Sequence, residues 1–250
     1  MKRALLAIAL IAACASMSGP AAAAQSLDRD ISLQGATTVR LNVSGPIHLI
    51  ASKGAGAIKL HVVDFGKTPP LTVRSSKTGR RLNVTVSGPS QSILPFVGAS
   101  GYELQVTYPA SLQLDVRQFA GSMHVDRVTA PMQLYNANGP IAVDVADSAL
   151  TAQADLGDIT VGSARGMVEL TCGTGNVTAT LDAGWRGNLV RMEASKGNLT
   201  LHVPARLRAN FDLTSGSGSV KNPLRSTPHA PLVFMLTEDG NVLVAPSDRS

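Results

Sequence analysis

The sequence predicts an all-β protein whose C-terminal half is a β-solenoid, in which short strands stack at a nearly constant spacing. Three observations support this fold class: a glycine-centred motif recurs seven times, apolar residues keep fixed distances from that glycine, and no convincing amphipathic helix follows the N-terminus. The composition agrees with this class. Aromatic residues are only 4% of the chain against 44% hydrophobic residues, so aliphatic side chains fill the core, and the β-branched ones favour strands.

The recurring motif is a glycine followed, two residues later, by an apolar side chain. The first four glycines are 18 residues apart and the later steps are 22, 21 and 22 residues. A unit of this size cannot bury its own apolar face, but stacked units form a continuous core. The seven glycines are Gly121, Gly139, Gly157, Gly175, Gly197, Gly218 and Gly240.

Three columns of apolar residues accompany these glycines, at seven and five residues before and two residues after. Alternation within each unit predicts strands with one buried face, and the constant offset predicts that each unit stacks in register on the preceding one. Thr160, Thr178 and Thr200 are expected to form an outward column. The apolar columns are Leu114, Met132, Leu150, Val168, Val190, Phe211, Val233; Val116, Leu134, Ala152, Leu170, Met192, Leu213, Met235; and Met123, Ile141, Ile159, Val177, Leu199, Val220, Val242.

A coil of 18 residues divides into three sides of about six residues, so a three-sided β-helix is expected. Two sides are the strands before and after the glycine. The third side is expected to be short and irregular, and to take up the extra residues of the longer coils. It is placed around Val128, Ala146 and Ala164, and the extra residues are 182–187, 204–208 and 222–230.

The N-terminal part of the mature chain is β-rich but less regular. Ser44-Gly45-Pro46-Ile47 is similar to Asn138-Gly139-Pro140-Ile141, so the early strands are interpreted as irregular β structure or degenerate coils of the same kind. Six strands are expected there, at residues 39–43, 47–50, 58–63, 71–73, 82–86 and 102–106. The predicted organisation is a signal peptide at 1–24, the irregular region at 25–105, the solenoid at 106–245 and a tail at 246–250.

The N-terminus has the features of a signal peptide. Lys2 and Arg3 precede an apolar stretch, and Ala22-Ala23-Ala24 offers a cleavage site before Gln25. The alternative is a lipobox at Ile11–Cys14 with acylation of the cysteine. We favour simple cleavage, because Cys14 comes very early. The protein is thus expected to be exported to the periplasm or the cell surface, with no transmembrane segment in the mature chain.

Charge and motifs exclude several functions. Cleavage would leave 20 basic and 17 acidic residues, a net charge of +3, and the basic residues are scattered without interleaved aromatics, which argues against nucleic-acid binding. Cys172 would be the only mature cysteine, so no internal disulfide is expected, and it is interpreted as a small buried thiol. No phosphate-binding loop or nucleophile elbow occurs; Ser217 lies in a glycine-rich turn.

The titratable residues give no strong sign of catalysis. Asp126 and Asp144 share one position of the motif and are expected about 5 Å apart on adjacent coils, where they could share a proton or hold a cation. We favour two solvated surface carboxylates. The histidines show no metal-binding interval and no shared ladder position, so neither a metal site nor another cofactor is expected. They are His48, His61, His124, His202 and His229.

A family resemblance rests on two segments. Tyr108-Pro-Ala-Ser-Leu112 leads into the glycine series at Gly121, and Val203-Pro-Ala-Arg-Leu207 leads into Gly218. This layout, over residues 35 to 245, resembles the bacterial "putative adhesin" family. The resemblance implies an exported β-helix with no catalytic motif to transfer.

These observations predict a non-enzymatic binding or structural surface in the cell envelope. The partner would be an envelope or extracellular protein or a glycan of unknown identity. One alternative is a carbohydrate-active β-helix enzyme, a polysaccharide lyase or hydrolase that uses the acidic pair; another is a periplasmic accessory or scaffold protein. Trp185 could equally cover the solenoid edge. The candidate contact residues in the lengthened third side are Trp185, Arg186, Arg206 and Arg208, with Arg225 nearby.

Overall fold

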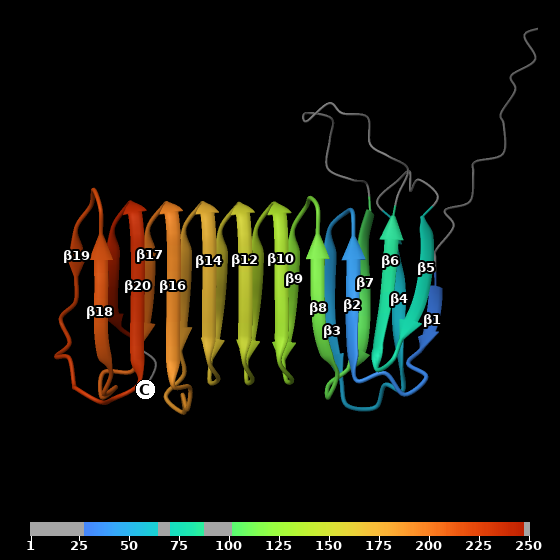
Figure 1. The fold of residues 1–250 in the computed structure, drawn as a ribbon, viewed down its shortest axis with the longest axis horizontal. Helices are drawn as coiled ribbons and strands as arrows, with labels where there is room; N and C mark the ends of the chain where they lie inside the picture. Colours follow the sequence, from blue (N-terminus) through green and yellow to red (C-terminus); the bar gives the residue numbers. More distant parts are fainter. Residues whose placement is uncertain (1–27, 65–70, 88–101, 248–250) are drawn as a thin grey trace, which may run out of the picture.

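The computed structural model describes residues 28–64, 71–87 and 102–247, and these residues form strands and no helix (Figure 1). The predicted all-β class is therefore confirmed. Within these ranges no helix could serve as a membrane span. The predicted signal peptide, with Cys14, lies outside the described residues.

The strands form two long sheets of mostly parallel strands. The order is β1-β4-β7-β3-β9-β11-β13-β15-β17-β21-β19 in the 11-stranded sheet and β18-β20-β16-β14-β12-β10-β8-β2-β6-β5 in the 10-stranded sheet. The strands are β1 (Asp28–Ser32), β2 (Thr38–Val43), β3 (Ile47–Ser52), β4 (Ala57–Asp64), β5 (Thr72–Thr78), β6 (Arg81–Ser87), β7 (Tyr102–Pro109), β8 (Gln113–Gln118), β9 (Met123–Val128), β10 (Met132–Asn138), β11 (Ile141–Ala146), β12 (Leu150–Leu156), β13 (Ile159–Ala164), β14 (Val168–Thr174), β15 (Val177–Leu181), β16 (Leu189–Lys196), β17 (Leu199–Val203), β18 (Asn210–Ser215), β19 (Val220–Lys221), β20 (Leu232–Asp239) and β21 (Val242–Pro246).

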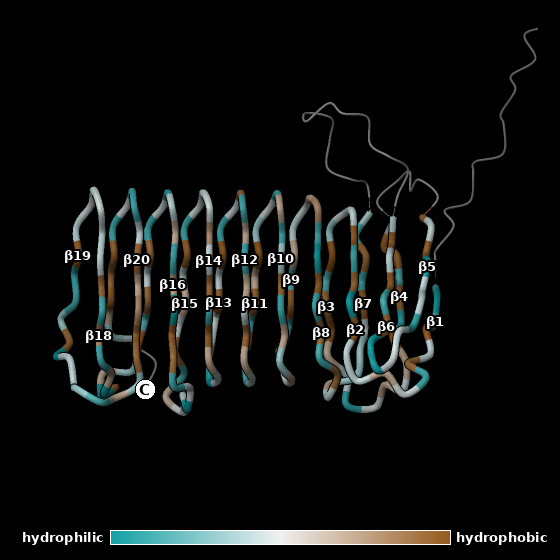
Figure 2. Tube along the Cα trace, viewed as in Figure 1, coloured by the Kyte–Doolittle hydropathy of each residue, from teal (hydrophilic) through white to brown (hydrophobic). Residues whose placement is uncertain are grey.

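Between β8 and β17 the chain alternates between the two sheets, so that successive units stack side by side (Figure 1). The predicted columns pair in register: Ile141 lies between Met123 and Ile159, and Val177 lies between Ile159 and Leu199. Thr178 likewise pairs with Thr160 and Thr200. Figure 2 shows hydrophobic segments recurring on strand after strand, which is the packing that the alternation predicts.

The expectation of three sides is not met, because the described residues form two sheets. Val128, Ala146 and Ala164 are the last residues of β9, β11 and β13 and are buried. Only residues 147–149 connect β11 to β12, which is too short for a third strand. The extra residues of the longer coils do lie outside the strands, in the loops β15–β16, β17–β18 and β19–β20.

The last two units also depart from the predicted order. The strand β20 pairs with both β16 and β18, and β21 pairs with both β17 and β19, so the final unit inserts before the preceding one. Val220, expected inside, is 43% exposed because β19 is the end strand of its sheet. The prediction that each unit stacks on the one before it in the sequence is therefore wrong at this end of the structure.

A similar insertion occurs at the other end. The unit of β2 and β3 lies between the unit of β6 and β7 and that of β8 and β9. All six N-terminal strands expected from the sequence are present, and β2, β3, β6 and β7 extend the same two sheets. The strand β1, rich in charge, was not predicted; β1, β4 and β5 pair antiparallel with their neighbours.

Polar side chains three residues before the corner glycines satisfy buried carbonyl groups. Asn136 Nδ2 donates to the Gly121 carbonyl at 2.8 Å, and Thr237 Oγ1 donates to the Gly197 carbonyl at 2.9 Å. Both side chains are fully buried. Since an unpaired buried carbonyl is costly, these bonds hold each corner to its neighbour.

Candidate functional site

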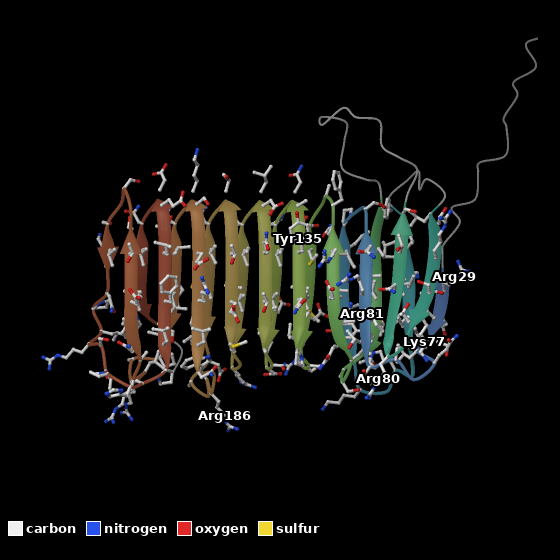
Figure 3. The ribbon with its side chains drawn as sticks, in the orientation of Figure 1. Arg29, Lys77, Arg80, Arg81, Tyr135 and Arg186 are labelled. Carbon is white, nitrogen blue, oxygen red and sulfur yellow. The ribbon has the colours of Figure 1, made fainter. Side chains whose placement is uncertain are left out.

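The four predicted contact residues all lie at one edge of the structure. We call this the turn edge: the loops that lead from the 11-stranded sheet to the 10-stranded sheet, including 182–188 and 204–209. Trp185 and Arg186 are in the first of these loops, and Arg206 and Arg208 are in the second. Figure 3 shows Arg186 projecting at this edge.

A chain of ion pairs crosses the turn edge. Asp147 accepts from Arg127 at 2.8 Å and from Arg165 at 3.2 Å, and Arg165 also pairs with Asp182 at 3.3 Å. The pKa of Asp182 is lowered, first by the backbone N–H of Gly184 and then by Arg165. Because the two arginine side chains are half-exposed and the network lies at the surface, these ion pairs are expected to contribute little to stability.

Beside this network lies a shallow hollow of about 690 Å³. Trp185 belongs to the loop that borders the hollow but does not line it: its ring is partly buried against the core, and Nε1 donates to the Gly166 carbonyl at 2.8 Å. This is the geometry of a covering residue, the second role considered for Trp185. The hollow is lined by Asp147, Arg165, Gly166, Met167, Asp182, Gly184, Arg186, Gly187 and Asn188.

The remaining arginines of the turn edge differ from Arg127 and Arg165. Arg186, Arg206 and Arg208 are exposed, and so is Arg225 in the β19–β20 loop. In the part of the chain that the structure describes, none of the four forms an ion pair. The sequence identified these residues because the loops depart from the 18-residue spacing.

The histidines correct one sequence expectation. His48 and His124 do share a ladder position, because β3 pairs with β9, and their rings meet edge to face with centroids 4.7 Å apart. The residues are far apart in the sequence, so their pairing depends on the inserted unit. A signal existed: each histidine follows a corner glycine, Gly45 or Gly121, by three residues.

The acidic pair also has partners that the sequence did not reveal. The His124 Nε2 atom lies 3.3 Å from Asp126 Oδ1 and 3.4 Å from Asp144 Oδ2. The His48 Nε2 atom lies 2.5 Å from the same Asp126 oxygen. The two carboxylates therefore do not simply repel each other on a solvated surface; an imidazole bridges them.

Cys172 is buried, as predicted, with 1% of its surface exposed, and Sγ donates to the Gly157 carbonyl at 3.2 Å. Burial first, and then the charges of Asp158 and Asp155, raise the pKa of the thiol to about 11. A thiol of this kind is a poor nucleophile, because the thiolate is the reactive form.

We expect Cys172 to resist alkylation while the protein is folded. At pH 8 the raised pKa leaves almost no thiolate, and burial blocks access. Iodoacetamide labelling followed by intact-mass measurement should show slow modification without denaturant and rapid modification in guanidinium. Equal rates in both conditions would contradict the buried position.

Among known proteins, only solved structures resemble this chain. No protein-family model matches the chain, and no curated protein matches it. Solved structures do match. A "putative adhesin" from Bacteroides fragilis is 13% identical with a TM-score of 0.46, and the match covers 90% of this chain and 98% of the other. A "putative cell adhesion protein" from Clostridium sporogenes is 10% identical with a TM-score of 0.45, and the match covers 89% of this chain and 99% of the other. A "putative lipid binding protein" from Parabacteroides distasonis is 13% identical at TM-score 0.37, covering 88% and 98%.

Proposed function

We propose that this chain is a non-enzymatic, exported β-solenoid of the cell envelope that binds an acidic glycan through its turn edge. The observation that carries the proposal is a set of exposed arginines in loops 182–188, 204–209 and 222–231 that form no ion pair with any described residue. Guanidinium groups recognise carboxylates and sulfates with paired, charge-assisted hydrogen bonds.

The contrast within the turn edge supports this proposal. Arg127 and Arg165 are held by Asp147 and Asp182, so their charge is compensated. Arg186 borders the same hollow and has no such partner among the residues that the structure describes. An extended acidic polymer could lie along the edge and contact the arginines of successive coils.

The test replaces Arg186, Arg206 and Arg208 together by alanine. We expect retention on a polyuronate resin to fall at least about tenfold, with the melting temperature unchanged, because exposed arginines contribute little to stability. Retention of the unmodified protein should also decrease with salt. The control is Arg80→Ala with Arg81→Ala, since both residues are exposed and lie away from these loops (Figure 3); it removes two charges against three, so the losses are compared per charge removed.

Equal loss in the control would show that only net charge matters. Retention on neutral dextran would contradict an acidic ligand. The release of shorter polyuronate chains during the same incubation would support the alternative, a carbohydrate-active enzyme.

Trp185 is expected to act on stability rather than on binding. Trp185→Ala removes the packing over the core and the bond to the Gly166 carbonyl, so we expect a loss of about 2–3 kcal/mol. Trp185→Phe should recover the packing part. Thermal melts and polyuronate retention measured together would check this, and lost retention with an unchanged melt would make the ring a contact residue instead.

A further inference from the structure

We propose that His48, His124 and Asp126, with Asp144 beside His124, form a binding site for one divalent transition-metal ion of the zinc class. The site lies on the outer face of the 11-stranded sheet, on the neighbouring strands β3, β9 and β11. It is separate from the turn edge: His124 follows the Gly121 corner at the opposite end of the unit.

The ligand atoms of three of these residues lie close together. One atom each from His48, His124 and Asp126 lies within 4.8 Å of the others. Both imidazoles turn Nε2 toward Asp126 Oδ1, at 2.5 and 3.3 Å, although their rings are steeply inclined, at 73°. The two nitrogens therefore share one carboxylate oxygen, so that three potential ligand atoms face the same space.

The spacing matches the coordination sphere of zinc. With Zn–N and Zn–O bonds of about 2.0–2.1 Å, neighbouring ligand atoms of a tetrahedral site are about 3.3 Å apart. The His124 Nε2 atom stands 3.3 Å from Asp126 Oδ1 and 3.4 Å from Asp144 Oδ2. The contact between His48 Nε2 and Asp126 Oδ1 is a hydrogen bond. An ion bound between the two atoms would take the place of the bonding proton and would increase their separation by less than ~1 Å.

The electrostatics of the cluster favour a cation. Within the described part of the chain, every ion pair of Asp126, Asp144 and Glu103 is made to a histidine and none to lysine or arginine. Three carboxylates thus meet around two imidazoles in a protein whose net charge is positive. Two nitrogen ligands favour zinc, nickel or copper over magnesium and calcium, which prefer oxygen alone.

The surroundings of His48 resemble the support of a metal ligand. Glu103 Oε1 lies 3.6 Å from Nδ1, the ring nitrogen that does not face Asp126. A carboxylate at this position orients a metal-bound imidazole and raises its basicity. Adjacent strands also position the ligands: the Ile47 amide donates to the Ser122 carbonyl at 3.0 Å, just before the two histidines.

The site is open to solvent, which gives an ion access. The exposed fraction is 24% for the His48 side chain, 40% for His124 and 42% for Asp126. A bound ion would connect the inserted unit of β2 and β3 to that of β8 and β9, which are distant in the sequence. Metal binding would therefore fasten the N-terminal unit to the stack.

The test is titration of the tag-free chain with Zn²⁺ in a calorimeter. We expect one ion per chain and a higher melting temperature with Zn²⁺, because only the folded state holds the ligands together. His48→Gln and His124→Gln keep a side chain of similar size at partly exposed positions, and each should weaken Zn²⁺ binding at least about tenfold. His61→Gln is the matched control, because His61 pairs with Asp28 at 2.5 Å but is not part of the cluster.

Three results would overturn the proposal: no saturable binding at one ion per chain, an equal effect of His61→Gln, or tighter binding of Ca²⁺ or Mg²⁺ than of Zn²⁺. Folding of the glutamine variants is checked by their melts without metal. Polyuronate retention measured in the same variants separates a failure here from a failure of the turn-edge proposal.

Discussion

Replacing Val177 by aspartate should destabilise the protein more than any other single change considered. Val177 is 0% exposed, on an interior strand of the 11-stranded sheet between Ile159 and Leu199. A carboxylate there would be buried without a partner, in a column made only of aliphatic side chains. We expect a loss of about 4 kcal/mol or more, and a melting temperature lower by roughly 10 °C or more.

The control is Thr178→Asp, one residue further along the same strand. Thr178 is only partly buried and pairs with Thr160 and Thr200 on the outer face. Its replacement should cost about 1 kcal/mol, mainly because aspartate is a poor strand residue. Thermal and urea unfolding of both variants measures the difference. Similar losses would mean that the side chains do not alternate between core and solvent as the structure shows.

The buried columns could be predicted because a strand that packs on one face must alternate, and because a stack requires the same offset in every unit. The order of the units could not. Each unit presents the same columns, so Val233 fits beside Val190 as well as beside Phe211, and the structure uses both neighbours. The alternation of apolar and polar residues does not indicate that the last unit lies between the two units that precede it in the sequence.

The candidate sites could be predicted only where they depend on spacing along the chain and not on contacts between distant units. The insertions at 182–187 and 204–208 could be identified because the glycine spacing of their coils exceeds 18 residues, and they lie in loops 182–188 and 204–209. The sequence could not predict whether the Trp185 ring packs on the core or faces solvent, because its orientation depends on the hydrogen bond to the Gly166 carbonyl of the preceding coil. The His48–His124 pair was missed because it requires the inserted N-terminal unit, which only the long-range pairing of β3 with β9 reveals.

The corner of the stack gives the second large effect, at Gly197. Its backbone φ angle is +143°, a value that residues other than glycine rarely adopt. A Cβ atom at this position would lie 1.9 Å from the Gly175 carbonyl oxygen and 2.6 Å from its carbon. Both are backbone atoms, so no side-chain rotation can relieve the contact.

The neighbouring units prevent the corner from moving away. The Gly175 amide donates to the Lys196 carbonyl at 2.9 Å, and the Gly197 amide donates to the Asp239 carbonyl at 2.8 Å. The Gly197 carbonyl also accepts from Thr237 Oγ1 at 2.9 Å. A shift of one corner would break the bonds on both sides.

We therefore expect Gly197→Ala to cost roughly 3–5 kcal/mol, from backbone strain and overpacking together. The control is Gly54→Ala, because Gly54 is exposed and an added Cβ there meets nothing within 4 Å. That substitution should be neutral or stabilise the protein by up to about 1 kcal/mol, since alanine restricts the unfolded chain. Urea unfolding with an unchanged m value measures both. A small loss at Gly197 would show that the stacked corners can separate, and that the sheets alone determine the spacing of the units.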